Sequence, residues 1–262
     1  MIQVIGHRGA RGHLPENTLE SFRYAIGLGV DGLELDVGVS RDGVVVVHHD
    51  RRLNPEVARG PDGKWLEGDP PAMFSMDFSE LRKIDIGRIR PGSEYDRRFP
   101  HQKPVDGLRM PRLSEVLSLE TRLNVEVKSS AKAPDDTPPP ESFARAVVAE
   151  IREAKAEKRC AILSFDFRIL KVVEREAAEL PTVYLTEGAD CTVENVRKAG
   201  AKTWACQFTQ LDEAKVRGAR EAGMRIVVWT VNDPAEIDRA FTLGVDAIIS
   251  DYPDRVLARR AR

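Results

Sequence analysis

Short runs of β-branched and other apolar residues alternate along the chain with longer stretches whose apolar positions recur at helical spacing. The runs predict strands and the stretches predict helices. Nine strands are predicted, at Ile2–Gly6, Gly32–Val37, Val44–His48, Asn124–Lys128, Ala161–Phe165, Thr182–Leu185, Thr203–Cys206, Arg225–Trp229 and Asp246–Ser250. Six helices are predicted, at Thr18–Leu28, Pro139–Ala156, Arg168–Ala178, Val193–Ala199, Asp212–Ala222 and Pro234–Leu243.

This alternation is typical of an α/β protein with a parallel sheet. Around Gly29, Gly223 and Gly244 the same order recurs: a helix, a glycine and then a strand. Eight such strands over 262 residues predict a single domain, a (β/α)8 TIM barrel covering 1–262. A doubly wound open sheet is the alternative, but no GxGxxG follows the first strand.

The ninth predicted strand belongs to a hairpin, because Asp42-Gly43 lies between two β-branched runs. A two-residue turn there places Asp36 opposite His49, on the same face, and turns His48 away. A slip of one residue would reverse that assignment. The following residues, 51–112, are rich in proline, glycine and charge, so we expect an inserted subdomain or lid after the second barrel strand and its hairpin.

Composition excludes several classes of partner. The chain has 40 basic and 42 acidic residues, which argues against a nucleic-acid-binding protein. No apolar run approaches the roughly 18 residues that cross a bilayer, so no stable membrane insertion is expected. Three widely spaced cysteines favour reduced thiols and a cytoplasmic location. The basic stretch 255–262 is expected to be a frayed, solvated helix end, and the oligomeric state is left open.

Acidic side chains interrupt two of the predicted buried strands. Glu34 and Asp36 are two apart, as are Glu126 and Lys128, so each pair shares one face. Carboxylates at the mouth of a barrel favour a divalent cation bound by oxygen, Mg²⁺ or Ca²⁺. Lys128 is expected to act either as a counter-ion or as a phosphate contact.

Further reactive groups lie at the predicted strand ends. His7 and Arg8 end the first strand, which suggests proton transfer beside phosphate binding. His49, expected beside Asp36, should have a raised pKa that suits a general acid. Trp229 is interpreted either as an apolar wall for a small substrate or as core packing.

Seven ordered segments together resemble the glycerophosphodiester phosphodiesterase family: HRGARGHLPENT, GLELDVGVSRDGVVVVHHD, MPRLSEVL, NVEVK, LSF, WTVN and DAIISDYP. The family is similar in fold to phosphatidylinositol-type phosphodiesterases, which are distorted barrels with a small insertion. The resemblance implies metal-dependent hydrolysis of glycerophosphodiesters to sn-glycerol 3-phosphate and an alcohol, within lipid and glycerol metabolism.

By position, the resemblance assigns His7 and His49 to acid–base catalysis, Arg8 and Lys128 to phosphate binding, and Glu34, Asp36 and Glu126 to the metal. It favours a cyclic phosphate intermediate, with direct hydrolysis as the alternative. Leu163 stands where the family often has serine, and the insertion matches poorly, which leaves the leaving alcohol open. Hydrolysis of lysophospholipids, as in lysophospholipase D relatives, and a catalytically silent phosphate-binding barrel are the competing interpretations.

Overall fold

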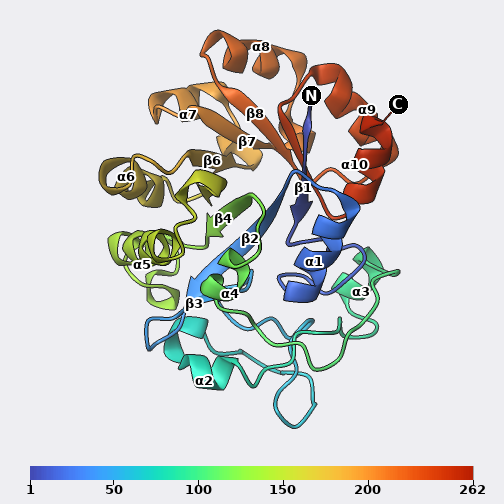
Figure 1. The fold of residues 1–262 in the computed structure, drawn as a ribbon, viewed down its shortest axis with the longest axis vertical. Helices are drawn as coiled ribbons and strands as arrows, with labels where there is room; N and C mark the ends of the chain where they lie inside the picture. Colours follow the sequence, from blue (N-terminus) through green and yellow to red (C-terminus); the bar gives the residue numbers. More distant parts are fainter. Residues whose placement is uncertain (262) are drawn as a thin grey trace.

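The computed structural model describes residues 1–261 and contains a closed ring of parallel strands (Figure 1). The ring consists of β1 (Gln3–His7), β2 (Gly32–Val39), β4 (Leu123–Val127), β5 (Cys160–Ser164), β6 (Thr182–Thr186), β7 (Thr203–Gln207), β8 (Arg225–Trp229) and β9 (Ala247–Ser250). Strand β1 pairs with both β9 and β2, which closes the ring. The predicted (β/α)8 barrel is confirmed, and each ring strand lies within two residues of its predicted bounds.

Helices cover the outside of the ring. The six predicted ones are α1 (Leu19–Leu28), α5 (Pro140–Glu153), α6 (Phe167–Glu176), α7 (Val193–Lys198), α8 (Glu213–Glu221) and α9 (Pro234–Leu243). Sequence periodicity missed α4 (Leu113–Leu117), which at five residues is too short to show a helical repeat, and α10 (Pro253–Arg260).

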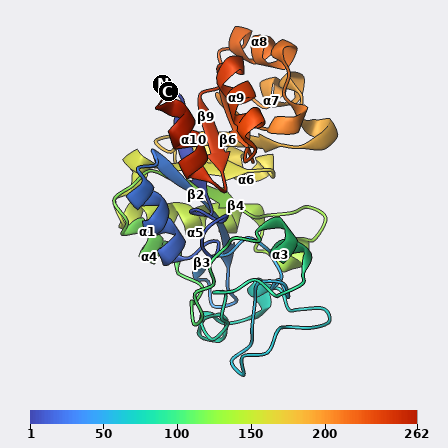
Figure 2. The same cartoon turned by 90° about the vertical axis from the view of Figure 1, so that its right-hand side faces the viewer.

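Helix α10 corrects the expectation of a frayed end for 255–262. Val256 is fully buried, and the Arg260 guanidinium donates to the carbonyl of Ile2 and pairs with Asp31. The helix therefore packs beside β1 at the start of the chain, as Figure 2 also shows. Arg262, the last residue of the predicted stretch, lies outside the described residues.

The hairpin after β2 differs from the prediction by one residue. Strand β3 (Val45–Val47) is antiparallel to β2, with Val37 opposite Val47. The Ser40 amide donates to the Val44 carbonyl at 3.0 Å, which encloses a three-residue loop. Gly43, at φ 84°, supplies the left-handed residue that such a loop requires.

This register moves His48, not His49, opposite Asp36. The His48 amide donates to the Asp36 carbonyl at 3.0 Å. The predicted pairing of Asp36 with His49 is therefore wrong, because the loop is one residue longer than the two-residue turn assumed from Asp42-Gly43.

Residues 51–112 form the connection from β3 toward α4. They contain two short α-helices, α2 (Phe78–Leu81) and α3 (Glu94–Arg98), and a 3₁₀ turn at Met73–Ser75. Figure 2 shows the segment gathered at the end of the molecule away from α7 and α8. Its apolar side chains pack into a cluster distinct from the barrel core, made of Val46, Leu53, Ala58, Met73, Phe78, Leu81, Ile84, Ile86 and Met110.

The cysteines differ from the expectation of three reduced thiols. Cys191, just before α7, is bonded to Cys206 of β7 as a disulfide, with Cα atoms 6.2 Å apart. Cys160 is free and buried. Within residues 1–261, no helix has both the length and the apolar character needed to cross a membrane.

Candidate active site at the barrel mouth

Six of the eight predicted site residues lie on, or directly after, three neighbouring strands at one end of the ring. His7 closes β1 and is in register with Glu34 on β2. Asp36, two residues further along β2, is in register with Glu126 on β4, and Lys128 directly follows that strand. Because carboxyl ends of parallel barrel strands meet at one rim, side chains that are distant in sequence converge here.

Glu34, Asp36 and Glu126 form a buried acidic cluster, in which one oxygen from each residue lies within 4.8 Å of the others. Burial and the neighbouring Asp36 carboxylate raise the pKa of Glu34 well above its usual value. Burial likewise raises the pKa of Glu126 to about 7. Burial would also raise the pKa of Asp36, but Lys128 and Arg8 outweigh it and hold that pKa well below normal. Three carboxylates this close cannot all ionise without a further positive charge.

The acidic cluster fits a divalent cation. Among the described residues, Glu34 Oε1 and Asp36 Oδ1 accept no hydrogen bond although both are buried. Lys128 Nζ partly balances the charge, at 2.7 Å from Glu126 Oε1 and 3.3 Å from Asp36 Oδ1. A cluster that offers carboxylate oxygens from three residues matches the preference of hard cations.

Arg8 is held by acidic groups on two sides. Its Nη1 donates to Glu16 Oε1 at 2.8 Å, and its Nε lies 3.1 Å from Asp36 Oδ2. Its backbone is left-handed, at φ 50°, and its amide donates to Glu34 Oε2 at 3.1 Å. Nη2 donates no hydrogen bond within residues 1–261, so this edge of the guanidinium remains available to a ligand.

His7 lies between the acidic cluster and the last strand of the ring. Its Nδ1 is 2.6 Å from Asp251 Oδ1, while Nε2 is 3.7 Å from Glu34 Oε2. Arg11 binds Asp251 through two nitrogens, at 2.8 and 3.1 Å. Burial lowers the pKa of His7 to about 4, with Arg11 adding to the effect and Asp251 opposing it. The neutral ring then carries its proton on Nδ1, and Nε2 is left as an acceptor.

His49 reaches the same site although the predicted register was wrong. Strand β3 ends at Val47, and the chain bends at His49. His49 Nδ1 is 2.8 Å from Asp50 Oδ1. Burial and Arg8 lower its pKa, while Asp36 opposes them, which reverses the raised pKa expected from the sequence.

Arg8 and Asp36 affect the pKa of both His48 and His49, but the two side chains differ in their exposure to solvent. The His48 ring is buried and its Nε2 has no hydrogen-bond partner among the described residues. The His49 side chain is 27% exposed. A substrate therefore has access to His49 and not to His48.

Five further residues complete the mouth, and none of them is among the predicted catalytic, phosphate-binding or metal-binding residues: Arg11, Glu16, Asn17, Tyr95 and Asp251. The amide of Asn17 donates to Asp36 Oδ2 at 2.9 Å, and the next residue, Thr18, caps α1. Asp251 follows β9, so its position at a strand end was a usable signal. Tyr95 comes from residues 51–112, where no periodicity indicated that it would reach the site.

Aromatic side chains line another part of the rim. Trp229, at the end of β8, is half-buried and donates from Nε1 to the Ala205 carbonyl at 3.1 Å. Phe165, after β5, is exposed and meets the Trp229 ring edge-on at 5.4 Å. Trp229 therefore packs partly in the barrel, while its role as an apolar wall for a substrate stays a prediction.

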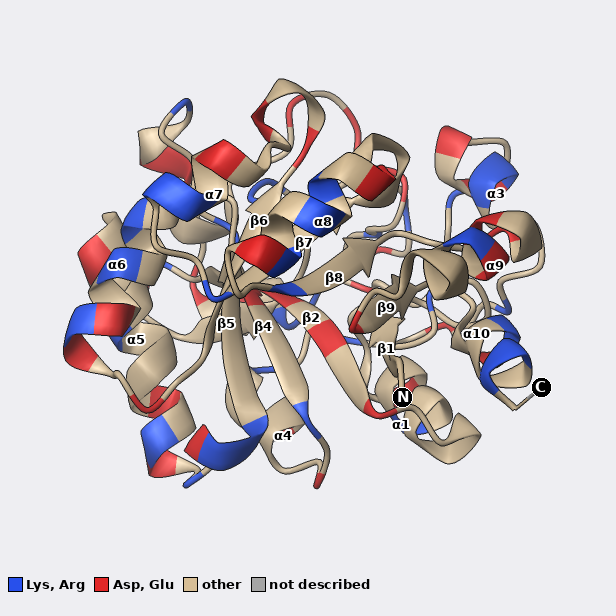
Figure 3. Cartoon of the chain, turned by 90° about the horizontal axis from the view of Figure 1, so that it is seen from above, with Lys and Arg blue, Asp and Glu red and all other residues tan. Residues whose placement is uncertain are grey.

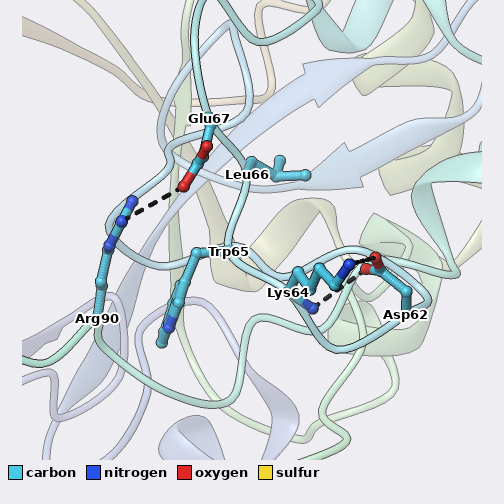
Figure 4. Close-up of a pocket in the computed structure, with 6 residues that line it drawn as sticks. All are labelled: Asp62, Lys64, Trp65, Leu66, Glu67 and Arg90. Carbon is cyan, nitrogen blue, oxygen red and sulfur yellow. Dashed lines mark hydrogen bonds and ion pairs between the residues drawn. The ribbon is translucent and has the colours of Figure 1, made fainter.

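A hollow elsewhere on residues 51–112 contains none of the predicted site residues. Figure 4 shows it lined by Trp65 and Leu66 between two ion pairs, Arg90 with Glu67 and Lys64 with Asp62. Figure 3 shows acidic and basic residues interspersed along the outer helices, with neither sign confined to one helix.

Comparisons with known proteins agree with this geometry. The model of the "Glycerophosphoryl diester phosphodiesterase family" matches residues 7–255. A glycerophosphodiester phosphodiesterase of Caldanaerobacter subterraneus subsp. tengcongensis is 29% identical, covering 97% of this chain and 96% of the relative.

Two solved structures share the fold. One, from Silicibacter pomeroyi DSS-3 and assigned as a glycerophosphoryl diester phosphodiesterase, is 36% identical with a TM-score of 0.93, over 98% of this chain and 92% of that one. The other, an Oleispira antarctica phosphodiesterase bound to its product sn-glycerol-3-phosphate, is 24% identical with a TM-score of 0.79, over 99% and 97%. The chain therefore belongs to the glycerophosphoryl diester phosphodiesterase family.

Proposed function

We propose that this enzyme hydrolyses glycerophosphodiesters to sn-glycerol 3-phosphate and an alcohol. The observation that carries the proposal is the convergence of a free guanidinium edge, a three-carboxylate cluster and two histidines at one barrel rim. Family membership supports this substrate class, and the Oleispira antarctica enzyme is bound to sn-glycerol-3-phosphate, the product that this proposal expects.

The phosphodiester anion is proposed to bind between Arg8 and Lys128. Glu16 and Asp36 fix the Arg8 side chain, so its free Nη2 is directed without loss of side-chain freedom on binding. Lys128 supplies a second positive charge. Glu34, Asp36 and Glu126 would hold Mg²⁺ or Ca²⁺, which when bound neutralises charge on the phosphate oxygens.

The two histidines are proposed to divide the proton transfers. His7 accepts the proton of the attacking hydroxyl or water at Nε2, because Asp251 keeps the ring proton on Nδ1. His49 donates a proton from Nε2 to the departing alcohol oxygen, while Asp50 holds its Nδ1. The negative charge of the bound phosphate would offset the fall in the His49 pKa caused by burial and Arg8.

Residues 51–112 are proposed to act as an inserted subdomain that limits the size of the leaving group within the single domain. Lysophospholipids would need apolar surface there, and six side chains of the segment are candidates for it: Trp65, Leu66, Met73, Phe74, Met76 and Phe78. Met73 and Phe78 are buried in the segment's own cluster, and Leu66 and Met76 pack against it. Four of the six therefore serve packing, which favours a small alcohol over an acyl chain.

The test of acid–base catalysis compares His7→Ala and His49→Ala with His101→Ala, an exposed histidine of the same inserted segment. Glycerol 3-phosphate release from glycerophosphocholine should fall by at least about 100-fold in the first two variants and stay near the wild-type rate in the third. Full activity of His49→Ala refutes its role. Phosphorus NMR of the products separates a cyclic phosphate intermediate from direct hydrolysis.

Substrate size is tested by comparing kcat/KM for glycerophosphocholine and lysophosphatidylcholine. The proposal predicts a clear preference for the smaller substrate. A preference for lysophosphatidylcholine would instead support a lysophospholipase D, and turnover of neither would support a catalytically silent barrel.

A further inference from the structure

The inserted segment places one side chain inside the barrel mouth. The Tyr95 hydroxyl, on α3, lies 3.2 Å from Arg8 Nη1 and 3.2 Å from Arg11 Nη1. These two arginines come from the loop after β1, more than eighty residues earlier in the chain. Tyr95 therefore joins the segment 51–112 to the group proposed to bind phosphate.

The position of Tyr95 is fixed from several directions. The Glu56 carboxylate accepts from the backbone amides of Glu94 and Tyr95 at 3.3 and 3.1 Å, which anchors the start of α3. The Tyr95 ring meets the buried Phe99 ring edge-on at 5.6 Å. Arg11 in turn lies over Phe99, 4.6 Å from the ring centre. A side chain held this firmly points its hydroxyl in one direction.

Within residues 1–261, the hydrogen bonds of Tyr95 leave its hydroxyl proton without a partner. A phenol oxygen accepts two hydrogen bonds and donates one. Arg8 and Arg11 are obligatory donors, so they take both acceptor positions. Burial raises the pKa of Tyr95 to about 12, so the hydroxyl keeps its proton at neutral pH. The nearby Glu16 Oε2 has no hydrogen-bond partner within residues 1–261, so it is not the acceptor.

Resting on the proposed function, we propose that Tyr95 is a substrate-binding residue that donates its hydroxyl proton to a non-bridging phosphate oxygen. Arg8 uses Nη1 for Glu16 and Tyr95, and its Nη2 is free on the adjacent edge of the same planar group. A phosphate on Nη2 thus lies beside Tyr95. The inserted segment 51–112 then binds the phosphate through Tyr95 and also limits the size of the leaving alcohol.

The experiment compares Tyr95→Phe, which removes only the hydroxyl, with Tyr24→Phe at an exposed tyrosine of α1. Steady-state kinetics on glycerophosphocholine give kcat and KM. Calorimetry with Mg²⁺ present gives the Kd for glycerol 3-phosphate, whether or not the enzyme turns over. Thermal melts report on folding.

For Tyr95→Phe we expect KM and Kd to rise by about tenfold, the effect of losing one hydrogen bond to an anion, with a smaller change in kcat. Tyr24→Phe should match the wild type. A Tyr95→Phe variant with a lower Tm but unchanged KM and Kd would show a purely structural role and overturn the inference. Wild-type protein that binds glycerol 3-phosphate without cleaving glycerophosphocholine would refute the proposed function and leave the Tyr95 binding test in force. Wild-type protein that does not bind glycerol 3-phosphate would overturn the inference.

Discussion

Replacing Asp251 with asparagine removes the negative charge that His7 and Arg11 share. The side chains of Arg11 and Asp251 are 4% and 2% exposed, and two N–H groups of Arg11 contact the carboxylate. Breaking a buried ion pair costs about 3–5 kcal/mol. The introduced asparagine would still accept one hydrogen bond and Glu16 lies near Arg11, so we expect a smaller loss, about 2–3 kcal/mol. At about 2–4 °C per kcal/mol for a chain of this size, Tm should fall by about 5–10 °C.

The same change should affect catalysis more strongly than stability. An asparagine amide facing His7 Nδ1 no longer holds the ring proton there. His7 then no longer keeps the tautomer in which Nε2 is free to accept a proton. We expect kcat to fall by about 10²–10⁴-fold, measured at a temperature where the variant is folded. Asp254→Asn is the matched control, because Asp254 pairs with His13 nearby but is 40% exposed. If Asp251→Asn keeps kcat within threefold of wild type, Asp251 does not position His7.

The pH dependence of this stability difference has a defined sign. Burial opposes ionisation of Asp251, but Arg11 and His7 outweigh it and lower its pKa far below the unfolded value. A depressed carboxyl pKa stabilises the folded state above the unfolded pKa of about 3.9 and loses that effect as pH falls toward the folded pKa. The gap in Tm between wild type and Asp251→Asn should therefore stay constant from pH 7 to 5 and shrink below about pH 4.

Three other outcomes follow from the structure. EDTA should abolish phosphodiesterase activity, and Mg²⁺ or Ca²⁺ should restore it; persistence of full activity in EDTA would exclude the proposed role of the acidic cluster. Burial raises the pKa of the Cys160 thiol to about 11, so iodoacetamide at pH 8 should label it only after unfolding, and rapid labelling of native protein would contradict this. Gly9→Ala should lower the unfolding free energy by more than about 1 kcal/mol in urea titrations, because Gly9 has φ 91° and an added Cβ meets the Ser21 side chain; an unchanged midpoint would be inconsistent with that contact.

The ring and the acidic cluster could be predicted from sequence because both depend on local patterns. Buried parallel strands appear as nearly continuous apolar runs, and Glu34, Asp36 and Glu126 stand out within them. Their common face follows from the two-residue period of a strand. The barrel fold and the acidic residues on its strands could therefore be predicted from local sequence patterns alone.

The errors all depend on contacts that sequence spacing does not encode. Asp42-Gly43 suits both a two-residue and a three-residue loop, since Gly43 adopts a positive φ in either. The lowered pKa of His49 comes from burial and from Arg8, which only the folded chain brings near. Tyr95 belongs to a long connection without periodicity, so its contact with Arg11 could not be predicted from the sequence.

The pairing of His7 with Asp251 also has a consequence for biosynthesis. The two residues are separated by 244 positions, and β1 is completed by pairing with β9. A ribosome has to release nearly the whole chain before the proposed base acquires its partner, so nascent or truncated chains should remain inert. Because α10 packs beside β1, the two ends could be joined by a short linker and the chain cut in an exposed loop. In such a circular permutant, His7 and Asp251 would be synthesised close together in time. Such a permuted chain would show whether catalytic competence during translation depends on the order in which the strands emerge.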